Sequence, residues 1–198
     1  MGSIAQPTES AEHCDADTSL TENGEVPPMA DEEVRALAQQ VQVLEDREAI
    51  RDLKALYCEI CDDGHDPGRI VEIFTADGIW ESDSLGEFRG RDAIRAQFAI
   101  FRDKVSFSQH MVTNPVITVE GDSAHGTWYF LTPIVVDDES RWNFVRYDDD
   151  YVRVDGRWKI EHLRVAMRVD AARHGRWLPA SPEADQHSVT QPVAPDGL

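Results

Sequence analysis

The stretch SFSQHMVTNPVITVEGDSAHGTWYFL, Ser106–Leu131, predicts two β-strands that fold back on each other. Its middle, Glu120-Gly121-Asp122, has the composition of a turn. Four strand-like runs occur in this half of the chain: His110–Glu120, Ser123–Val136, Trp142–Val154 and Arg157–Val169. The last two are joined by Asp155-Gly156, which is a strong signal for a two-residue hairpin. We therefore expect an antiparallel meander.

The chain before these strands is predicted to be mainly helical. Residues 30–61 lack Gly and Pro and contain good helix formers throughout, although a shift of the apolar stripe suggests a break near Glu45-Asp46. Beyond that point a single helix face carries Ile50, Leu53, Tyr57, Ile60 and Cys61. Residues 69–82 predict a short helix and then a strand around Ile79-Trp80, and residues 90–104 an amphipathic helix. Helices followed by an antiparallel sheet indicate an α+β fold.

Composition changes at both ends of the chain. Residues 1–33 contain no Lys or Arg and have the composition of a disordered acidic leader. Residues 178–198 are rich in proline and predict a flexible C-terminal tail. The folded domain is expected at residues 34–177, a length that suits one domain with a substantial core.

The charge balance argues against several kinds of partner. Nineteen Lys and Arg against thirty-eight Asp and Glu give a formal net charge of −19, which disfavours nucleic acid and anionic membrane surfaces. A small neutral substrate is not disfavoured. The start of the chain lacks the features of a secretory signal, and three cysteines make no disulfide framework, so we expect a cytoplasmic protein.

Several short motifs occur in the order found in one known superfamily. They are Phe74–Trp80 (FTADGIW), Gly90–Ile94 (GRDAI), His110–Ile117 (HMVTNPVI), Gly126–Tyr129 (GTWY) and Tyr151–Ile160 (YVRVDGRWKI). In this order the chain resembles the SnoaL-like branch of the nuclear transport factor two-like superfamily. The resemblance implies a cone-shaped, curved antiparallel sheet packed on three N-terminal helices, with a deep pocket at one end.

Two lyases of this superfamily, hexachlorocyclohexane dehydrochlorinase and bile-acid 7α-dehydratase, are the most similar in pattern. Their shared Asp and His fall on Asp62 and His110, and a tyrosine of the dehydratase falls on Tyr57. The resemblance thus implies that His110 is a general base, that Asp62 orients it, and that Tyr57 donates a hydrogen bond. By helical periodicity Asp62 projects away from the apolar face, and the adjacent Asp63 less so. The resemblance favours Asp62, and Asp63 stays an alternative.

The sequence motifs say less about substrate-binding residues than about catalytic ones. Aromatic side chains at strand or helix positions are expected in the core first and on the pocket wall second; they include Trp80, Phe98, Trp128 and Phe144. The dehydratase's active-site arginine matches only approximately: Met167 falls closest, with Arg168 beside it and Arg164 nearby. Arg168 is taken as the candidate.

Other chemistries have little support. The Cys58–Cys61 pair ends a helix, whereas a redox Cys-x-x-C motif begins one. No histidine spacing typical of a metal site and no glycine-rich nucleotide motif occurs, so we expect no metal and no cofactor. In the run Asp148–Asp150, strand alternation predicts at least one inward acid, although a solvated sheet edge would also explain it.

The sequence thus predicts a cofactor-independent lyase, a dehydratase-type enzyme with a His-Asp dyad, acting on a bulky, mostly apolar alicyclic or aromatic molecule. An isomerase or cyclase would need nearly the same groups. A non-catalytic binding protein, or one like a dioxygenase β-subunit, would instead have a filled cavity and a histidine with no carboxylate near it. The resemblance to this family also suggests a homodimer or a homotrimer.

Overall fold

The computed structural model of the chain describes residues 31–173. Most of the predicted leader (1–33) and all of the tail (178–198) lie outside this range. The chain divides by its contacts into a unit that ends at Val41 and a unit that begins at Gln42. Within the described range, the first unit consists of the first turns of helix α1. The second unit holds the sheet, the other helices and the pocket.

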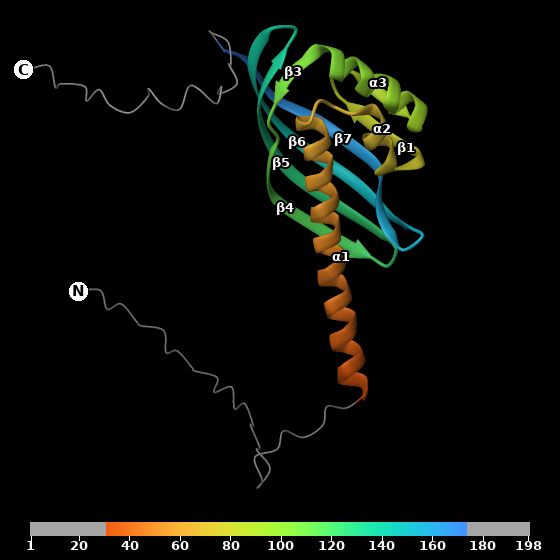
Figure 1. The fold of residues 1–198 in the computed structure, drawn as a ribbon. Helices are drawn as coiled ribbons and strands as arrows, with labels where there is room; N and C mark the ends of the chain where they lie inside the picture. Colours follow the sequence, from red (N-terminus) through yellow and green to blue (C-terminus); the bar gives the residue numbers. More distant parts are fainter. Residues whose placement is uncertain (1–30, 174–198) are drawn as a thin grey trace, which may run out of the picture. The chain divides into compact units, whose positions relative to one another are not determined.

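Helices and strands follow the predicted order (Figure 1). The elements are α1 (Asp31–Asp62), α2 (Pro67–Glu72), β1 (Phe74–Ser82), β2 (Gly86–Arg89), α3 (Arg91–Lys104), β3 (Val105–Ser108), β4 (Met111–Glu120), β5 (Ser123–Val136), β6 (Glu139–Val154) and β7 (Arg157–Ala172). The predicted break near Glu45-Asp46 is wrong, because α1 continues through it without Gly or Pro. Strands β2 and β3 were not predicted, since each has only four residues.

The sheet is mixed, which corrects the expectation of a purely antiparallel one. Its strand order is β2-β1-β7-β6-β5-β3, and β4 also pairs with β5. Strands β4 to β7 form the predicted antiparallel meander, whereas β1 pairs with β7 in parallel. No short turn joins β1 to β7, so local sequence does not set their relative direction.

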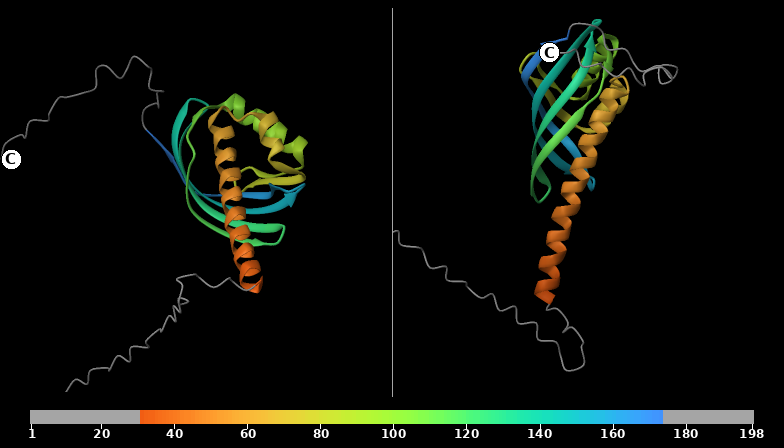
Figure 2. Two further views of the ribbon diagram at one scale, coloured as in Figure 1. Left: turned by 60° about the horizontal axis from the view of Figure 1, so that its bottom comes forward. Right: turned by 90° about the vertical axis from the view of Figure 1, so that its left-hand side faces the viewer.

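The sheet curls around the C-terminal part of α1, with α2 and α3 beside it (Figures 1 and 2). The predicted apolar face of α1 is buried in the core against the sheet; its members are Ile50, Leu53, Tyr57, Ile60 and Cys61. Among the described residues the fold is therefore α+β, as predicted.

A break between two strands that both pair with β5 shapes the site. Strand β3 pairs with β5 at Ile134–Val136, and β4 pairs with β5 at Ser123–Leu131. Gln109 and His110 lie between β3 and β4, so His110 precedes the strand that it was predicted to begin. Its backbone N–H is consequently available to a partner outside the sheet.

A buried carboxylate links α1 to the β6–β7 hairpin. Asp46 accepts hydrogen bonds from Arg153 Nη2 at 2.6 Å, from Trp158 Nε1 at 3.2 Å and from Gln42 Nε2 at 3.2 Å. Burial by itself would raise the pKa of Asp46, but these donors outweigh it and lower the pKa. A carboxyl whose pKa is lower in the folded state stabilises the fold above its unfolded pKa, near 3.9.

We expect Asp46→Asn to reduce the free energy of unfolding at pH 7 by about 1–2 kcal/mol, because it weakens charge-assisted hydrogen bonds. The difference from the wild type should shrink as the pH falls through the lowered pKa of Asp46, where the wild type also loses the charge. Urea unfolding from pH 7 to pH 3 measures this. Asp122→Asn is the control, since Asp122 also contacts Arg153 but its side chain is 81% exposed. A difference that stays constant to pH 3 would contradict the assignment.

Candidate active site

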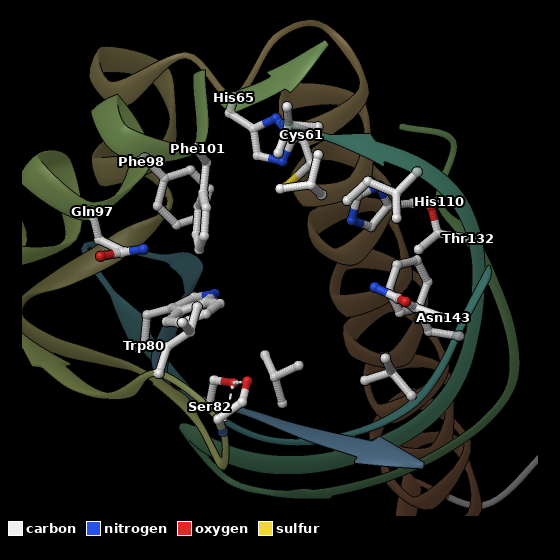
Figure 3. A pocket seen from close by; sticks show the side chains of 18 of the residues that line it. Cys61, His65, Trp80, Ser82, Gln97, Phe98, Phe101, His110, Thr132 and Asn143 are labelled. Carbon is white, nitrogen blue, oxygen red and sulfur yellow. Dashed lines mark hydrogen bonds between the residues drawn. The ribbon is translucent and has the colours of Figure 1, made fainter. Parts of the chain in front are cut away.

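A cavity of about 490 Å³ lies between the concave face of the sheet and helices α1 and α3. Aromatic and aliphatic side chains form most of its wall, and polar groups are few. Figure 3 shows Phe98, Phe101 and Trp80 facing His110, Thr132 and Asn143 across the cavity. The polar side chains on the wall include Ser82, Gln97, Thr132, Asn143, His65 and His110.

His110 and Asp62 form a close pair at this wall. Asp62 is the last residue of α1, and the break between β3 and β4 brings His110 to this helix end. His110 Nδ1 lies 2.5 Å from Asp62 Oδ1, and the His110 backbone N–H donates to Oδ2 at 2.8 Å. Ser108 Oγ donates to the same carboxylate at 3.2 Å. Three groups therefore hold the carboxylate in place.

This pairing fixes which nitrogen of His110 carries the proton. An ionised carboxylate only accepts hydrogen bonds, so Nδ1 is the donor, and in the neutral form of the ring Nε2 carries the lone pair. The imidazole stacks on Phe130 with a ring-centroid distance of 4.5 Å and an interplanar angle of 19°. His110 and Phe130 both line the cavity. The structure thus holds an oriented imidazole at the wall, an arrangement suited to general-base chemistry.

Tyr57 lies beside this pair, with its ring nearly perpendicular to that of His110 at a centroid distance of 6.4 Å. Its hydroxyl accepts a hydrogen bond from Trp80 Nε1 at 3.0 Å, which leaves the hydroxyl proton for the neighbouring Cys61 sulfur or for a bound molecule. Burial raises the pKa of Tyr57 well above its usual value, so the phenol stays protonated. Tyr57 can therefore donate a hydrogen bond at the cavity wall.

The two cysteines of the Cys-x-x-C segment are free and buried. Burial raises the pKa of Cys58 to about 11 and that of Cys61 well above its usual value. Both thiols are therefore protonated at neutral pH and are poor nucleophiles.

The alternative partner, Asp63, lies outside the cavity. Its carboxylate pairs with Arg69 Nη1 at 2.8 Å and is largely exposed. The geometry thus brings Asp62 and not Asp63 to His110. Helical periodicity misjudged this because Asp62 ends the helix, where the approaching β3–β4 segment decides which side chain is covered.

The predicted substrate-binding residues divide into two groups. Trp80 and Phe98 line the cavity, but Trp128, Phe144 and Arg168 do not. Trp128 shares a face of β5 with Phe130 but lies nearer the start of the strand. There its indole N–H donates to the Tyr151 hydroxyl at 3.1 Å.

Strand alternation directs Phe144 away from the cavity, and Arg168 is the residue that an irregularity in the β6–β7 register leaves without a pairing partner. Phe144 lies between Asn143 and Val145, which both line the cavity, and is 45% exposed. Arg168 is exposed beside Met167, which lines the cavity. Arg164 pairs with Asp150 at 2.8 Å and is also absent from the wall. Among the described residues, no arginine reaches the cavity lining.

Sequence reasoning missed several wall residues. Thr132 and Ile134 share the face of β5 that carries Phe130. The alternation of side chains along this strand could therefore have predicted them as wall residues. His65, in the loop after α1, had no pattern that pointed to the cavity.

A buried ion pair lies behind the wall. Lys54 Nζ lies 2.8 Å from Asp149 Oδ2, and the two side chains are 1% and 0% exposed. Tyr151 donates to the same oxygen at 2.9 Å. Lys54 Nζ also lies 3.3 Å from the ring centroid of Tyr147, a residue of the cavity wall. Asp149 is therefore the inward acid that strand alternation predicted, and the ion pair supports the wall through Tyr147.

Within residues 31–173 there is no group of three or more His, Cys, Asp or Glu side chains placed to hold a metal ion. No helix in the same range combines the length and apolar character needed to cross a bilayer.

The curled mixed sheet, the helix that it encloses and the pocket between them define an α+β protein of the nuclear transport factor two-like class. Residues 42–164 match the SnoaL-like domain, and the chain belongs to this family. The resemblance found in the sequence motifs is thereby confirmed.

Solved structures share this fold. Hexachlorocyclohexane dehydrochlorinase LinA type 2 is similar with a TM-score of 0.66 at 23% identity, over 71% of this chain and 98% of that chain. A candidate scytalone dehydratase from Novosphingobium aromaticivorans gives 0.61 at 22% identity, over 67% and 91%. A candidate aromatic ring hydroxylase from the same bacterium gives 0.61 at 26% identity, over 66% and 94%.

Proposed function

We propose that the protein is a cofactor-independent lyase that eliminates a leaving group from a bulky, mostly apolar alicyclic or aromatic molecule. The observation that carries this proposal is the 2.5 Å pairing of His110 Nδ1 with Asp62 Oδ1 at the wall of an apolar cavity. Two of the similar folds belong to proteins described as a dehydrochlorinase and a candidate dehydratase, which agrees with this chemistry.

In this mechanism His110 Nε2 takes a proton from carbon while the leaving group departs from the neighbouring carbon. Asp62 stabilises the imidazolium that forms, and it holds the ring in the tautomer that can act as a base. Tyr57 donates a hydrogen bond to an oxygen that gains negative charge. When hydroxide leaves, it takes the proton from His110, so water is released and the base is regenerated.

The cavity suits a substrate of this kind. A volume of about 490 Å³ accommodates a molecule of two or three fused rings, and the aromatic wall favours an apolar surface. A non-catalytic member was expected to have an occluded cavity and a histidine far from any carboxylate. The open cavity and the His110–Asp62 pair favour the enzyme.

A screen of ring compounds tests the proposal. Each compound carries a hydroxyl or a chloride next to an activated C–H bond. Gas chromatography coupled to mass spectrometry follows the loss of substrate and the mass of the product. We expect loss of water or hydrogen chloride with the wild type, and elimination slower by at least about 10²-fold with His110→Ala or Asp62→Asn. Turnover that neither substitution slows would reject the assigned dyad. A product of unchanged mass would instead indicate the isomerase.

A further inference from the structure

His65 occupies a conformation and a position that stability alone does not favour. It follows Gly64 after the end of α1, and its φ of 56° is unusual for a residue with a side chain. The residue is 6% exposed and lines the cavity. Figure 3 shows its ring at the cavity beside Cys61. An Asn or Gly would adopt this backbone conformation more readily.

The ring of His65 contains a polar atom that the protein leaves unpaired. Nδ1 is buried and has no hydrogen-bonding partner within the described residues. The neighbours on one side are apolar, with ring-centroid distances of 6.1 Å to Phe98 and 5.7 Å to Phe101. An apolar side chain would pack here without a buried, unsatisfied nitrogen, so packing does not explain the imidazole.

The charge state of His65 follows from its surroundings. Burial, with a smaller contribution from the nearby His110 and against the opposing effect of Asp62, lowers its pKa to about 4. The imidazole is therefore neutral at neutral pH and carries one N–H group. A buried N–H without an acceptor is rarer in proteins than a buried lone pair without a donor. This favours the tautomer with a bare Nδ1 and the proton on Nε2.

His65 and His110 then offer opposite groups to the same cavity. His110 Nδ1 donates to Asp62, so its Nε2 accepts, whereas Nε2 of His65 donates. The two ring centroids are 6.4 Å apart. Nitrogens on two rings this close to each other can meet the hydrogen and the oxygen on adjacent carbon atoms of one ligand.

We propose that His65 is a second catalytic histidine, whose Nε2–H donates a hydrogen bond to an oxygen of the bound molecule. In the elimination, on which this role rests, that oxygen belongs to the leaving hydroxyl group. The C–H proton passes to His110, the C–H electron pair forms the double bond, and the C–O bond breaks. The departing hydroxide accepts the hydrogen bond from His65 and then takes the proton from His110 to become water. His65 itself keeps its proton.

Two variants separate this role from packing. His65→Asn suits the positive φ, but its short amide cannot reach the position of Nε2. His65→Gln is longer and places an N–H group near that position. We expect His65→Asn to lower kcat for an alcohol substrate about 10²-fold, with a much smaller loss for the matching chloride, which leaves without a proton. His65→Gln should recover part of the alcohol activity.

A binding measurement tests the donor without turnover. We expect the wild type to bind 2-naphthol about five- to tenfold more tightly than naphthalene by calorimetry, because the hydroxyl gains a hydrogen bond. His65→Asn should remove this preference without weakening naphthalene binding, and His65→Gln should retain it. The ¹⁵N shift of His65 Nε2 should change with 2-naphthol but not with naphthalene. His125→Asn, on the outer surface, is the control variant.

The outcomes distinguish the two proposals. If no compound is turned over but the 2-naphthol preference depends on His65, the lyase assignment fails and the hydrogen-bond donor stands. The role of His65 is rejected by a different result: elimination occurs, His65→Asn lowers kcat equally for the alcohol and the chloride substrate, and the variant still binds 2-naphthol more tightly than naphthalene.

Discussion

His110→Ala is expected to lower kcat/KM for the elimination by about 10²–10⁴-fold, which is the usual contribution of a positioned general base. The ring's Nε2 is the acceptor that the Asp62 pairing leaves free at the cavity wall. Steady-state kinetics on a substrate identified by the screen measures the effect. The melting temperature of the variant shows whether the loss of the stack on Phe130 disturbs the fold.

Asp62→Asn should cause a loss of similar size, because an amide facing Nδ1 and the His110 backbone N–H cannot accept from both and hold the tautomer. Since the two residues act as a unit, the double variant should be no slower than His110→Ala alone. The surface pair of His125 and Asp150, at 2.9 Å, provides a matched control. His125→Ala should leave kcat/KM unchanged. Fully additive losses at Asp62 and His110 would contradict their coupling.

Lys54→Met is expected to reduce the free energy of unfolding by about 3–5 kcal/mol, because it leaves the Asp149 carboxylate charged and buried without its cation. Asp149 Oδ1 already has no partner within the described residues, so the site holds no spare donor. Burial raises the pKa of Asp149, although Lys54 and Tyr151 oppose this effect. Chemical unfolding at pH 7 measures the loss.

Two controls interpret this result. The double variant Lys54→Met/Asp149→Leu removes both charges and should recover much of the stability. Arg51→Met breaks an exposed pair with Glu48 on the same helix and should change stability little. A loss for Lys54→Met no larger than that for Arg51→Met would show that the buried pair has no special energetic role.

Much of the candidate site was accessible from the sequence through the family resemblance and not through periodicity. The motifs predicted His110, Asp62 and Tyr57, and the structure brings these three side chains together, with His110 and Tyr57 lining the cavity. The helical period correctly identified the buried face that contains Tyr57. The same helical period disfavoured Asp62, because a regular period does not describe the contacts of a residue at a helix end.

The sequence by itself determined the helices, the longer strands, the α+β class and the family. These features depend on periods of 3.6 and 2, on turn residues and on motif order, all of which are local. Only the tertiary structure decided that β1 pairs in parallel with β7, that Asp149 meets Lys54, and that His65 reaches the cavity. It also excluded Trp128, Phe144 and Arg168 from the cavity wall. The physical reason is that sheet curvature and position along a strand follow from packing between residues far apart in the chain, and no local pattern encodes that packing.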